Sequence, residues 1–303
     1  MYRLVQDQRI FMNTIVEISA WTDLDRSLVY ELFDKAYQQF HFVIDRFSRF
    51  KNDSELSRLN EKTGEEVKVS QELFNLITFA LEIAKKTNGA FDPTVIDFLE
   101  TYGYNAHYDF KRLSHKELLK REIQQILKER PSFKEIQINR KDLSIRLAKT
   151  QRIDLGSLGK GYAIDLAYRK LLPLKNYVIN AGGDIRARGS GKGNKPWLVG
   201  LKVPGCKPIG VTFLTNEALC CSGGWARKVQ FFHHLINPKT GEPENYYQAT
   251  FVRAKTAIEA DAWATALFVL GKKAPEIIQK YNIRALLFTH SGGQLPYNFS
   301  YTC

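Results

Sequence analysis

The sequence predicts an α+β protein with a mostly antiparallel sheet core and flanking helices. Residues 1–150 are rich in segments whose apolar side chains recur at helical spacing. Residues 151–303 contain short strand-like segments that are mostly joined by turns, and a full helix rarely separates two of them. This pattern favours antiparallel pairing over a doubly wound parallel sheet. A chain of 303 residues fits one large domain or two intertwined lobes of about 1–150 and 151–303.

In the helix-rich first half, residues 10–21 alternate between apolar and polar side chains and predict one strand. Residues 24–47 carry apolar side chains at the spacing of a helix. Ser70 can cap a further helix that runs to Asn88 and stops at Gly89. Residues 134–148 predict a hairpin.

The sheet-rich second half contains six segments that read as strands. They are residues 177–188, 197–203, 209–214, 226–236, 248–255 and 283–289. Between the first half and these strands, residues 162–172 predict a helix.

The apolar segments are too short for a membrane span. The longest apolar run covers residues 262–270, whereas a spanning helix needs about 20 apolar residues. Polar side chains, including Asp7 and Glu17, interrupt the N-terminus where a signal peptide needs an apolar core. We therefore expect a cytoplasmic protein, or a periplasmic or membrane-anchored one if a signal segment has been removed.

The positive charge is concentrated in the second half. The formal net charge is +12, and residues 1–150 hold 24 basic and 23 acidic side chains, whereas residues 151–303 hold 20 basic and 9 acidic ones. A field of this sign attracts polyanions such as a nucleotide diphosphate, a nucleic acid or an acidic partner. Because the basic residues are scattered with no run of four, we do not expect a nucleic-acid partner.

Residues 153–161 (IDLGSLGKG) predict a strand end, a glycine turn and the start of the helix at 162–172. Such a turn exposes backbone N–H groups beside Lys160, an arrangement that proteins use to hold a phosphate. The segment is not a Walker A loop, because Gly161 follows Lys160 where that motif needs Ser or Thr. A plain strand-to-helix turn is the alternative interpretation.

Asp261 and Thr265 lie four residues apart in a helical segment and therefore share one helix face. A carboxylate and a hydroxyl placed in this way can ligate a hard cation such as Mg²⁺. The alternative is that Asp261 only stabilises the N-terminus of the helix.

Two turns carry further candidate residues. His234 precedes a turn rich in Pro and Gly, where it is either a functional group or a solvated strand-end histidine. Phe91 and Asp92 follow the helix stop at Gly89, either as site residues or as parts of a helix C-cap and an Asx-type turn.

The order of these motifs carries more information than any one of them. Seven blocks together resemble the FAD:protein FMN transferase family, also called the ApbE family, over about residues 10 to 290. The blocks are residues 12–14 (MNT), 47–60 (FSRFKNDSELSRLN), 89–94 (GAFDPT), 154–161 (DLGSLGKG), 180–184 (NAGGD), 234–238 (HLINP) and 260–265 (ADAWAT).

The resemblance implies one flavin transferase domain with its FAD and Mg²⁺ site between the two halves. It implies a Mg²⁺-dependent enzyme that cleaves the diphosphate of FAD, its substrate, and attaches FMN through a phosphoester to a threonine of an acceptor flavoprotein, releasing AMP. The alternatives are hydrolysis of FAD to FMN and AMP, and FAD binding without catalysis. The chain has no Asp-Gly dipeptide, on which the acceptor motif of this family is centred, so we expect modification in trans.

The resemblance also assigns roles to residues. Contacts with the flavin and the nucleotide are implied for Met12, Phe50, Ala90, Phe91, Asp92, Asp154, Lys160 and Leu235. Metal ligation is implied for Asp261, Thr265 and the backbone carbonyl of Ser157, and the role of general base for His234.

Three positions depart from the family pattern. The chain has Asn13, Phe50 and Asn237 where the family commonly has Gly, Tyr and Asp. Phe50 can stack on a flavin but lacks the hydroxyl of a tyrosine. If the family's Asp acts on the imidazole, Asn237 lowers the basicity of His234, and we expect Asn237→Asp to leave activity intact or to raise it.

Overall fold

The structure is a computed structural model that describes residues 1–105, 110, 115–225, 227–230 and 232–302. Its largest sheet has eight strands in the order β1-β2-β6-β7-β10-β11-β12-β13. Every neighbouring pair in this sheet, among the described residues, runs antiparallel. The strands are β1 (Arg3–Phe11), β2 (Thr14–Thr22), β6 (Tyr177–Ala181), β7 (Asp184–Arg188), β10 (Ala218–Gly223), β11 (Ala249–Ala254), β12 (Arg284–Phe288) and β13 (Gln294–Tyr297).

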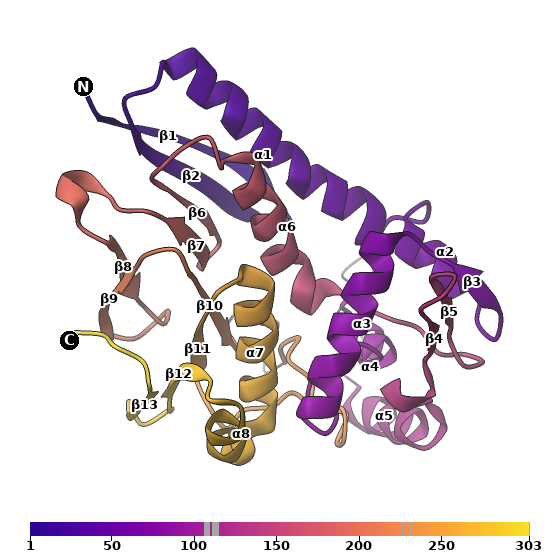
Figure 1. Cartoon of the computed structure of the whole chain (residues 1–303). Coiled ribbons are helices and arrows are strands. Elements are labelled where there is room, and N and C mark those ends of the chain that lie inside the picture. The colour runs from indigo at the N-terminus through magenta and orange to yellow at the C-terminus, as the bar shows by residue number, and fades with distance from the viewer. Residues whose placement is uncertain (106–109, 111–114, 226, 231, 303) are drawn as a thin grey trace.

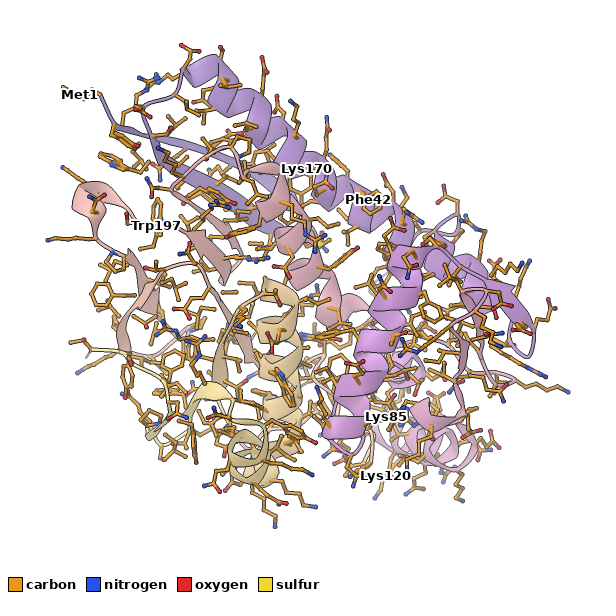
Figure 2. All side chains as sticks on the ribbon, in the orientation of Figure 1. Met1, Phe42, Lys85, Lys120, Lys170 and Trp197 are labelled. Atoms are coloured by element: carbon orange, nitrogen blue, oxygen red, sulfur yellow. The ribbon has the colours of Figure 1, made fainter. Side chains whose placement is uncertain are left out.

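Helices cover one face of this sheet and a hairpin covers the other (Figure 1). Helices α1 (Arg26–Phe47), α6 (Gly156–Lys170) and α7 (Ala257–Leu270) pack side by side on the first face. Strands β8 (Trp197–Leu201) and β9 (Gly210–Leu214) form a separate two-stranded sheet whose buried side chains pack with those of β7, β10, β11 and β12. Side chains fill the space between these layers (Figure 2). The predicted α+β class with antiparallel pairing is confirmed.

The remaining elements form the surroundings of this layered body. They are α2 (Glu55–Glu61), α3 (Gln71–Lys86), α4 (Ile96–Thr101), α5 (Lys116–Glu129), α8 (Ala274–Tyr281), the small sheet of β3 (Glu66–Lys68), β4 (Gln137–Asn139) and β5 (Ser144–Arg146), and the short 3-10 helices η2 (Phe133–Glu135), η3 (Lys192–Asn194) and η4 (Gly271–Lys273). Among the described helices, none combines the length and the apolar character that a membrane crossing requires.

Two segments that were predicted as single strands are hairpins. Residues 10–21 turn back at Met12 and Asn13, whose φ angles of 51° and 60° are those of a two-residue type I′ turn. Residues 177–188 turn back at Gly182 and Gly183. A Cβ on Gly182 would lie 2.3 Å from the side-chain oxygen of Thr14, so the two turns pack against each other. Residues 12–13 (MN) carry no strong turn signal, whereas the glycine pair at 182–183 is a turn signal that the prediction did not use.

The sequence prediction also misplaced elements in the second half. Strand β10 was not predicted, because its sequence ALCCSG lacks the β-branched and aromatic residues that mark strands. Residues 226–236 were predicted as a strand, but the described residues there form only an isolated bridge between Val229 and Phe232 and another from Ile236 to Pro243, while residues 226 and 231 lie outside the described part.

Helix α6 begins at Gly156, six residues before its predicted start, so the predicted glycine turn is helical. A Cβ on Gly161 would lie 2.6 Å from the carbonyl oxygen of Ala257. The glycine therefore allows α6 to approach the N-terminus of α7 closely. Asp165, one turn further along α6, accepts hydrogen bonds from the first amides of α7, those of Ala257 and Ile258, at 2.8 and 2.9 Å. These contacts fix α7 relative to α6.

This close approach predicts opposite effects for two glycines of one helix. Gly161→Ala forces a methyl group into the backbone of α7 and should lower the free energy of unfolding by about 1 to 3 kcal/mol. Gly159→Ala meets no atom within 4 Å and should raise it by about 0.5 to 1 kcal/mol through helix propensity. Urea denaturation of both variants measures the difference. Equal effects of the two substitutions would contradict the proposed helix contact.

Candidate active site

All twelve residues selected from the sequence lie on the wall of one cavity of about 1260 Å³. They come from the β1–β2 turn, the segments after α1 and α3, the residues just before α6 and its first half, the segment that precedes β11, and α7. The residues are Met12, Phe50, Ala90, Phe91, Asp92, Asp154, Ser157, Lys160, His234, Leu235, Asp261 and Thr265. Both halves of the chain therefore contribute to the cavity.

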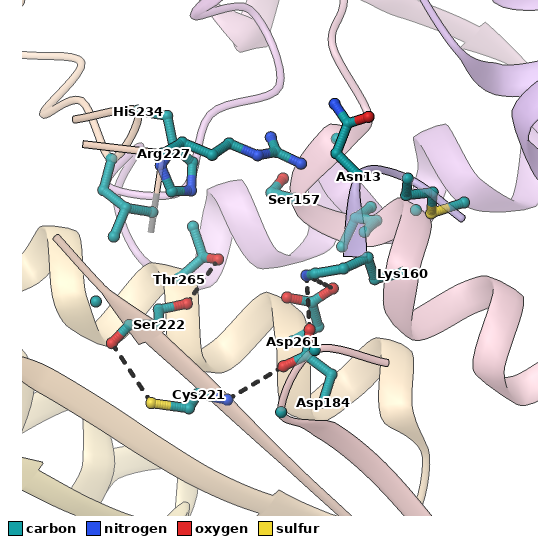
Figure 3. A pocket seen from close by; sticks show the side chains of 18 of the residues that line it. Asn13, Ser157, Lys160, Asp184, Cys221, Ser222, Arg227, His234, Asp261 and Thr265 are labelled. Atoms are coloured by element: carbon teal, nitrogen blue, oxygen red, sulfur yellow. Dashed lines mark hydrogen bonds and ion pairs between the residues drawn. The ribbon is translucent and has the colours of Figure 1, made fainter. Parts of the chain in front are cut away.

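One end of the cavity contains a cluster of buried charges (Figure 3). The Lys160 ammonium lies 2.6 Å from a carboxylate oxygen of Asp184 and 3.6 Å from one of Asp261. Asp184 and Asp261 are only 4 and 5 % exposed. The side chain that was expected to face a phosphate thus lies between two carboxylates.

Backbone amides complete the binding of these carboxylates. Gly161 donates to Asp261 at 3.2 Å, and Cys221 donates to Asp184 at 3.2 Å. Burial raises the pKa of Asp261, the Lys160 ammonium opposes this shift, and the nearby Asp184 carboxylate adds to it. Burial disfavours the charged form of Lys160, but the two carboxylates outweigh this effect and raise its pKa.

Two hydroxyl groups adjoin the charge cluster. Thr265 lies one helical turn after Asp261 on α7, and its hydroxyl oxygen is 3.2 Å from that of Ser222 at the end of β10. The described residues contain no group of three or more His, Cys, Asp and Glu side chains arranged to hold a metal. The oxygen donors match a hard cation such as Mg²⁺, which binds through one or two carboxylates and takes its other ligands from water or substrate phosphates.

The start of α6 forms the floor beside this cluster. Asp154 accepts a hydrogen bond from the amide of Gly156 at 2.7 Å, so this N–H group is already occupied. The amides from Gly156 to Gly161 belong to a helix. Those of Leu158 and Gly159 donate to the Leu155 carbonyl oxygen, and that of Gly161 donates to Asp261. The predicted phosphate-holding turn is therefore reduced to the first residues of α6, among which Ser157 lines the cavity.

Arg49 connects this floor to an aromatic wall. Its guanidinium contacts Asp154 and Glu100, each at 3.3 Å or less, and the arginine side chain is only 5 % exposed. The same guanidinium lies 4.1 Å from the ring centroid of Phe50. One face of Phe50 is therefore covered by a cation, while the side chain remains 41 % exposed.

Asp92 lines the cavity, but its carboxylate is occupied by neighbouring residues. One oxygen accepts from the amide and the hydroxyl of Thr94 at 2.8 and 2.7 Å. The other lies 2.9 Å from the Arg130 guanidinium. The expected Asx-type turn is confirmed, and this carboxylate holds the turn that carries Ala90 and Phe91.

The two adjacent histidines have different surroundings. His233 is 2 % exposed, accepts a hydrogen bond at Nδ1 from the amide of Leu235, and pairs through Nε2 with the side-chain oxygen of Asn245 at 3.1 Å. His234 faces the cavity, with its ring centroid 6.4 Å from that of Tyr104 (Figure 3). Of the pair, His234 is therefore the one placed to meet a ligand.

Asn237 has a different environment from the one expected. Its side-chain amide donates to Glu244 at 3.1 Å, and its side-chain oxygen accepts from the amide of Lys239 at 3.0 Å. These bonds organise the turn that follows His234. A carboxylate at position 237 would face that of Glu244, so Asn237→Asp should carry a stability cost. The expectation that this substitution preserves or raises activity stays a prediction.

Sequence reasoning missed four residues of the cavity. Asp184 was noted only as the end of a glycine-containing block, although a carboxylate after a glycine pair is a signal for a site turn. Ser222 and Arg49 carry no local signal, since their partners Thr265 and Asp154 are distant in the sequence. Arg227 was missed because its segment was predicted as a strand.

The environment of His233 predicts a pH dependence of stability. Burial lowers the pKa of His233 below the ordinary value of 6.5. Below that value the unfolded chain binds a proton that the folded chain does not, so the free energy of unfolding should fall as the pH falls from about 7.5 to about 5. His233→Gln should reduce this slope, whereas His115→Gln, at an exposed position, should not. Urea titrations across this range provide the measurement, and an unchanged slope in His233→Gln would refute the assignment.

The contact between Asn237 and Glu244 predicts a double-mutant effect. Asn237→Asp places two carboxylates together and should lower the free energy of unfolding by about 1 kcal/mol. In a Glu244→Gln background the same substitution should cost much less, because the side-chain amide introduced by Glu244→Gln can donate to the new carboxylate. Denaturant melts of the four proteins test this. An equal loss of unfolding free energy in both backgrounds would contradict an interaction between positions 237 and 244.

Comparison with known proteins agrees with this architecture. The sequence model of the ApbE family matches residues 12–287. The FAD:protein FMN transferase of Haemophilus influenzae is 30 % identical over 290 residues, covering 87 % of this chain and 81 % of that protein. That of Escherichia coli K12 is 27 % identical over 277 residues, covering 86 % and 78 %.

Solved structures give the same result for the fold. The ApbE protein of Thermotoga maritima superposes with a TM-score of 0.86 at 27 % identity, over 97 % of each chain. The flavin transferase ApbE from Vibrio cholerae has a TM-score of 0.85 at 23 % identity, over 98 % of this chain and 97 % of that one. Since the family match extends over most of the sequence, the chain belongs to the ApbE family.

Proposed function

We propose that this chain transfers FMN from FAD to a threonine of an acceptor flavoprotein in trans, through a phosphoester bond, with release of AMP. One observation carries the proposal. A single cavity holds a set of buried oxygen donors, the start of a helix and a histidine on the facing wall. The names of the relatives in H. influenzae and E. coli support it.

The cavity suits a dinucleotide in size and lining. Its volume of about 1260 Å³ exceeds that of most small-molecule pockets, which are about 300 to 1,000 Å³. Phe50 lines the cavity with a side chain that is 41 % exposed, and Met12 and Phe91 add apolar contact area for the flat isoalloxazine ring. We treat residues 1–303 as one domain, with this site between its two halves.

The proposed metal is Mg²⁺, and the oxygen donors of the site fit it. Asp261, Thr265 and the backbone carbonyl of Ser157 would hold the ion. When bound, it would neutralise charge on the diphosphate. The Lys160 ammonium opposes the rise that burial causes in the pKa of Asp261, because it stabilises the charged form of that carboxylate.

The transfer itself needs a base on the side of the attacking hydroxyl. A threonine hydroxyl is almost fully protonated at neutral pH, so we assign proton removal to His234. The acceptor oxygen then forms a bond to the phosphorus of the FMN portion. The bond from that phosphorus to the oxygen of AMP breaks, and AMP leaves with the electron pair.

This mechanism predicts that His234 acts on transfer rather than on binding. His234→Asn should change FAD affinity by only a few-fold but slow FMN transfer by about 10² or more. His233→Gln should have a much smaller effect, because His233 does not line the cavity. Single-turnover assays with mass spectrometry of the acceptor, alongside FAD titration of each variant, give both quantities. If His234→Asn transfers FMN at the wild-type rate, His234 is not the base. If the wild-type protein only releases FMN and AMP, it is a hydrolase and not a transferase.

A further inference from the structure

The cavity has little positive charge available for a diphosphate, although the chain as a whole is basic. Five carboxylates and four cationic side chains line its described walls. The acidic residues are Glu17, Asp92, Asp154, Asp184 and Asp261, and the cationic ones are Arg49, Lys160, Lys202 and Arg227. The diphosphate of FAD adds two negative charges to this set, so the available cations decide how it is held.

Two of the four cations are already paired with protein carboxylates. Arg49 contacts Glu100 and Asp154, and Lys160 contacts Asp184 and Asp261. Among the described residues, no carboxylate lies within ion-pair distance of Lys202 or Arg227. Either of these two cations can therefore meet an anionic ligand without first breaking a salt bridge.

Arg227 is the one directed at the charged end of the cavity. Its guanidinium extends from the wall that carries His234 toward Ser157 at the start of α6 (Figure 3). It thus approaches the residues that the proposed function assigns to the diphosphate and its metal. Lys202 directly follows β8, on the hairpin that covers the other face of the sheet.

The backbone holds Arg227 in an unusual conformation. Its φ angle is 54°, a left-handed value that non-glycine residues adopt at a cost of about 1 to 2 kcal/mol. The Tyr104 hydroxyl donates to the Arg227 carbonyl oxygen at 2.6 Å, and the Tyr104 ring also lies against His234. Tyr104 therefore ties Arg227 and the proposed base to the same wall. Strained residues held in this way are common at functional sites.

We propose that Arg227 is a catalytic residue that binds the non-bridging oxygens of the phosphoryl group being transferred. The inference rests on the proposed function. During attack, negative charge is shared by these oxygens and the departing AMP oxygen, and a guanidinium can donate two parallel hydrogen bonds to it. Arg227 gains and loses no proton in this step, since the hydroxyl proton goes to His234.

The experiment compares Arg227→Gln and Arg227→Lys with the control Lys228→Gln, which changes the neighbouring exposed cation that does not line the cavity. These changes leave the hydrogen bond from Tyr104 possible, because it is made to the backbone carbonyl. FAD affinity is measured by flavin fluorescence, and single-turnover FMN transfer by mass spectrometry of the acceptor. Arg227→Gln should weaken FAD binding less than tenfold but slow transfer about 10²- to 10³-fold. The transfer rate of Arg227→Lys should fall between those of Arg227→Gln and wild type, and that of Lys228→Gln should stay within about threefold of wild type.

A second variant separates catalysis from folding. Added guanidinium ion at low millimolar concentration should restore part of the transfer rate of Arg227→Ala but not that of Arg227→Gln, whose side chain fills the space. If the wild-type protein transfers FMN and the transfer rate of Arg227→Gln lies within about threefold of the wild-type rate, the assignment of Arg227 is overturned and the proposed function stands. A wild-type protein that transfers no FMN to any acceptor would overturn both.

Discussion

Two aspartates of this protein are buried within reach of one ammonium group. Removing a carboxylate from water costs of the order of several kcal/mol, so a buried aspartate needs partners that offset this cost. Lys160 and the amides of Gly161 and Cys221 are these partners for Asp184 and Asp261. These groups lie on α6 and β10, and the carboxylates on β7 and α7. The four elements therefore meet at this cluster.

Other features of the structure follow from this requirement. Gly161 allows α6 to touch the N-terminus of α7, which brings Asp261 beside Lys160. The glycine turn before Asp184 packs against Thr14, so the β1–β2 turn with Met12 lies next to the same cluster. The cavity is thus a consequence of how the buried charges are accommodated.

The sequence predicted the elements whose signals are local. Apolar spacing located α1 and α3, and the order of seven short blocks located the residues of the cavity. The start of α6 was missed, because Gly156, Gly159 and Gly161 indicate a turn unless the contact with α7 is known. Strand β10 was missed for a similar reason. Its cysteines and small residues suit a strand only because they are buried between α7 and the β8–β9 hairpin, which the fold alone shows. The roles of Asn237 and Arg227 depend on Glu244 and Tyr104, whose contacts only the fold creates.

The central claim is that the cluster of Lys160, Asp184 and Asp261 marks the place where a hard cation and the diphosphate of FAD are bound together. The most direct measurement is FAD affinity, by fluorescence titration, in excess Mg²⁺ and in excess EDTA, for wild type and Asp261→Asn, with riboflavin as the ligand without phosphates. The account predicts that Mg²⁺ tightens FAD binding to wild type at least about tenfold, equivalent to about 1.4 kcal/mol, has little effect on Asp261→Asn, and does not change riboflavin binding. Equal affinity of the wild-type protein for FAD in Mg²⁺ and in EDTA would contradict it.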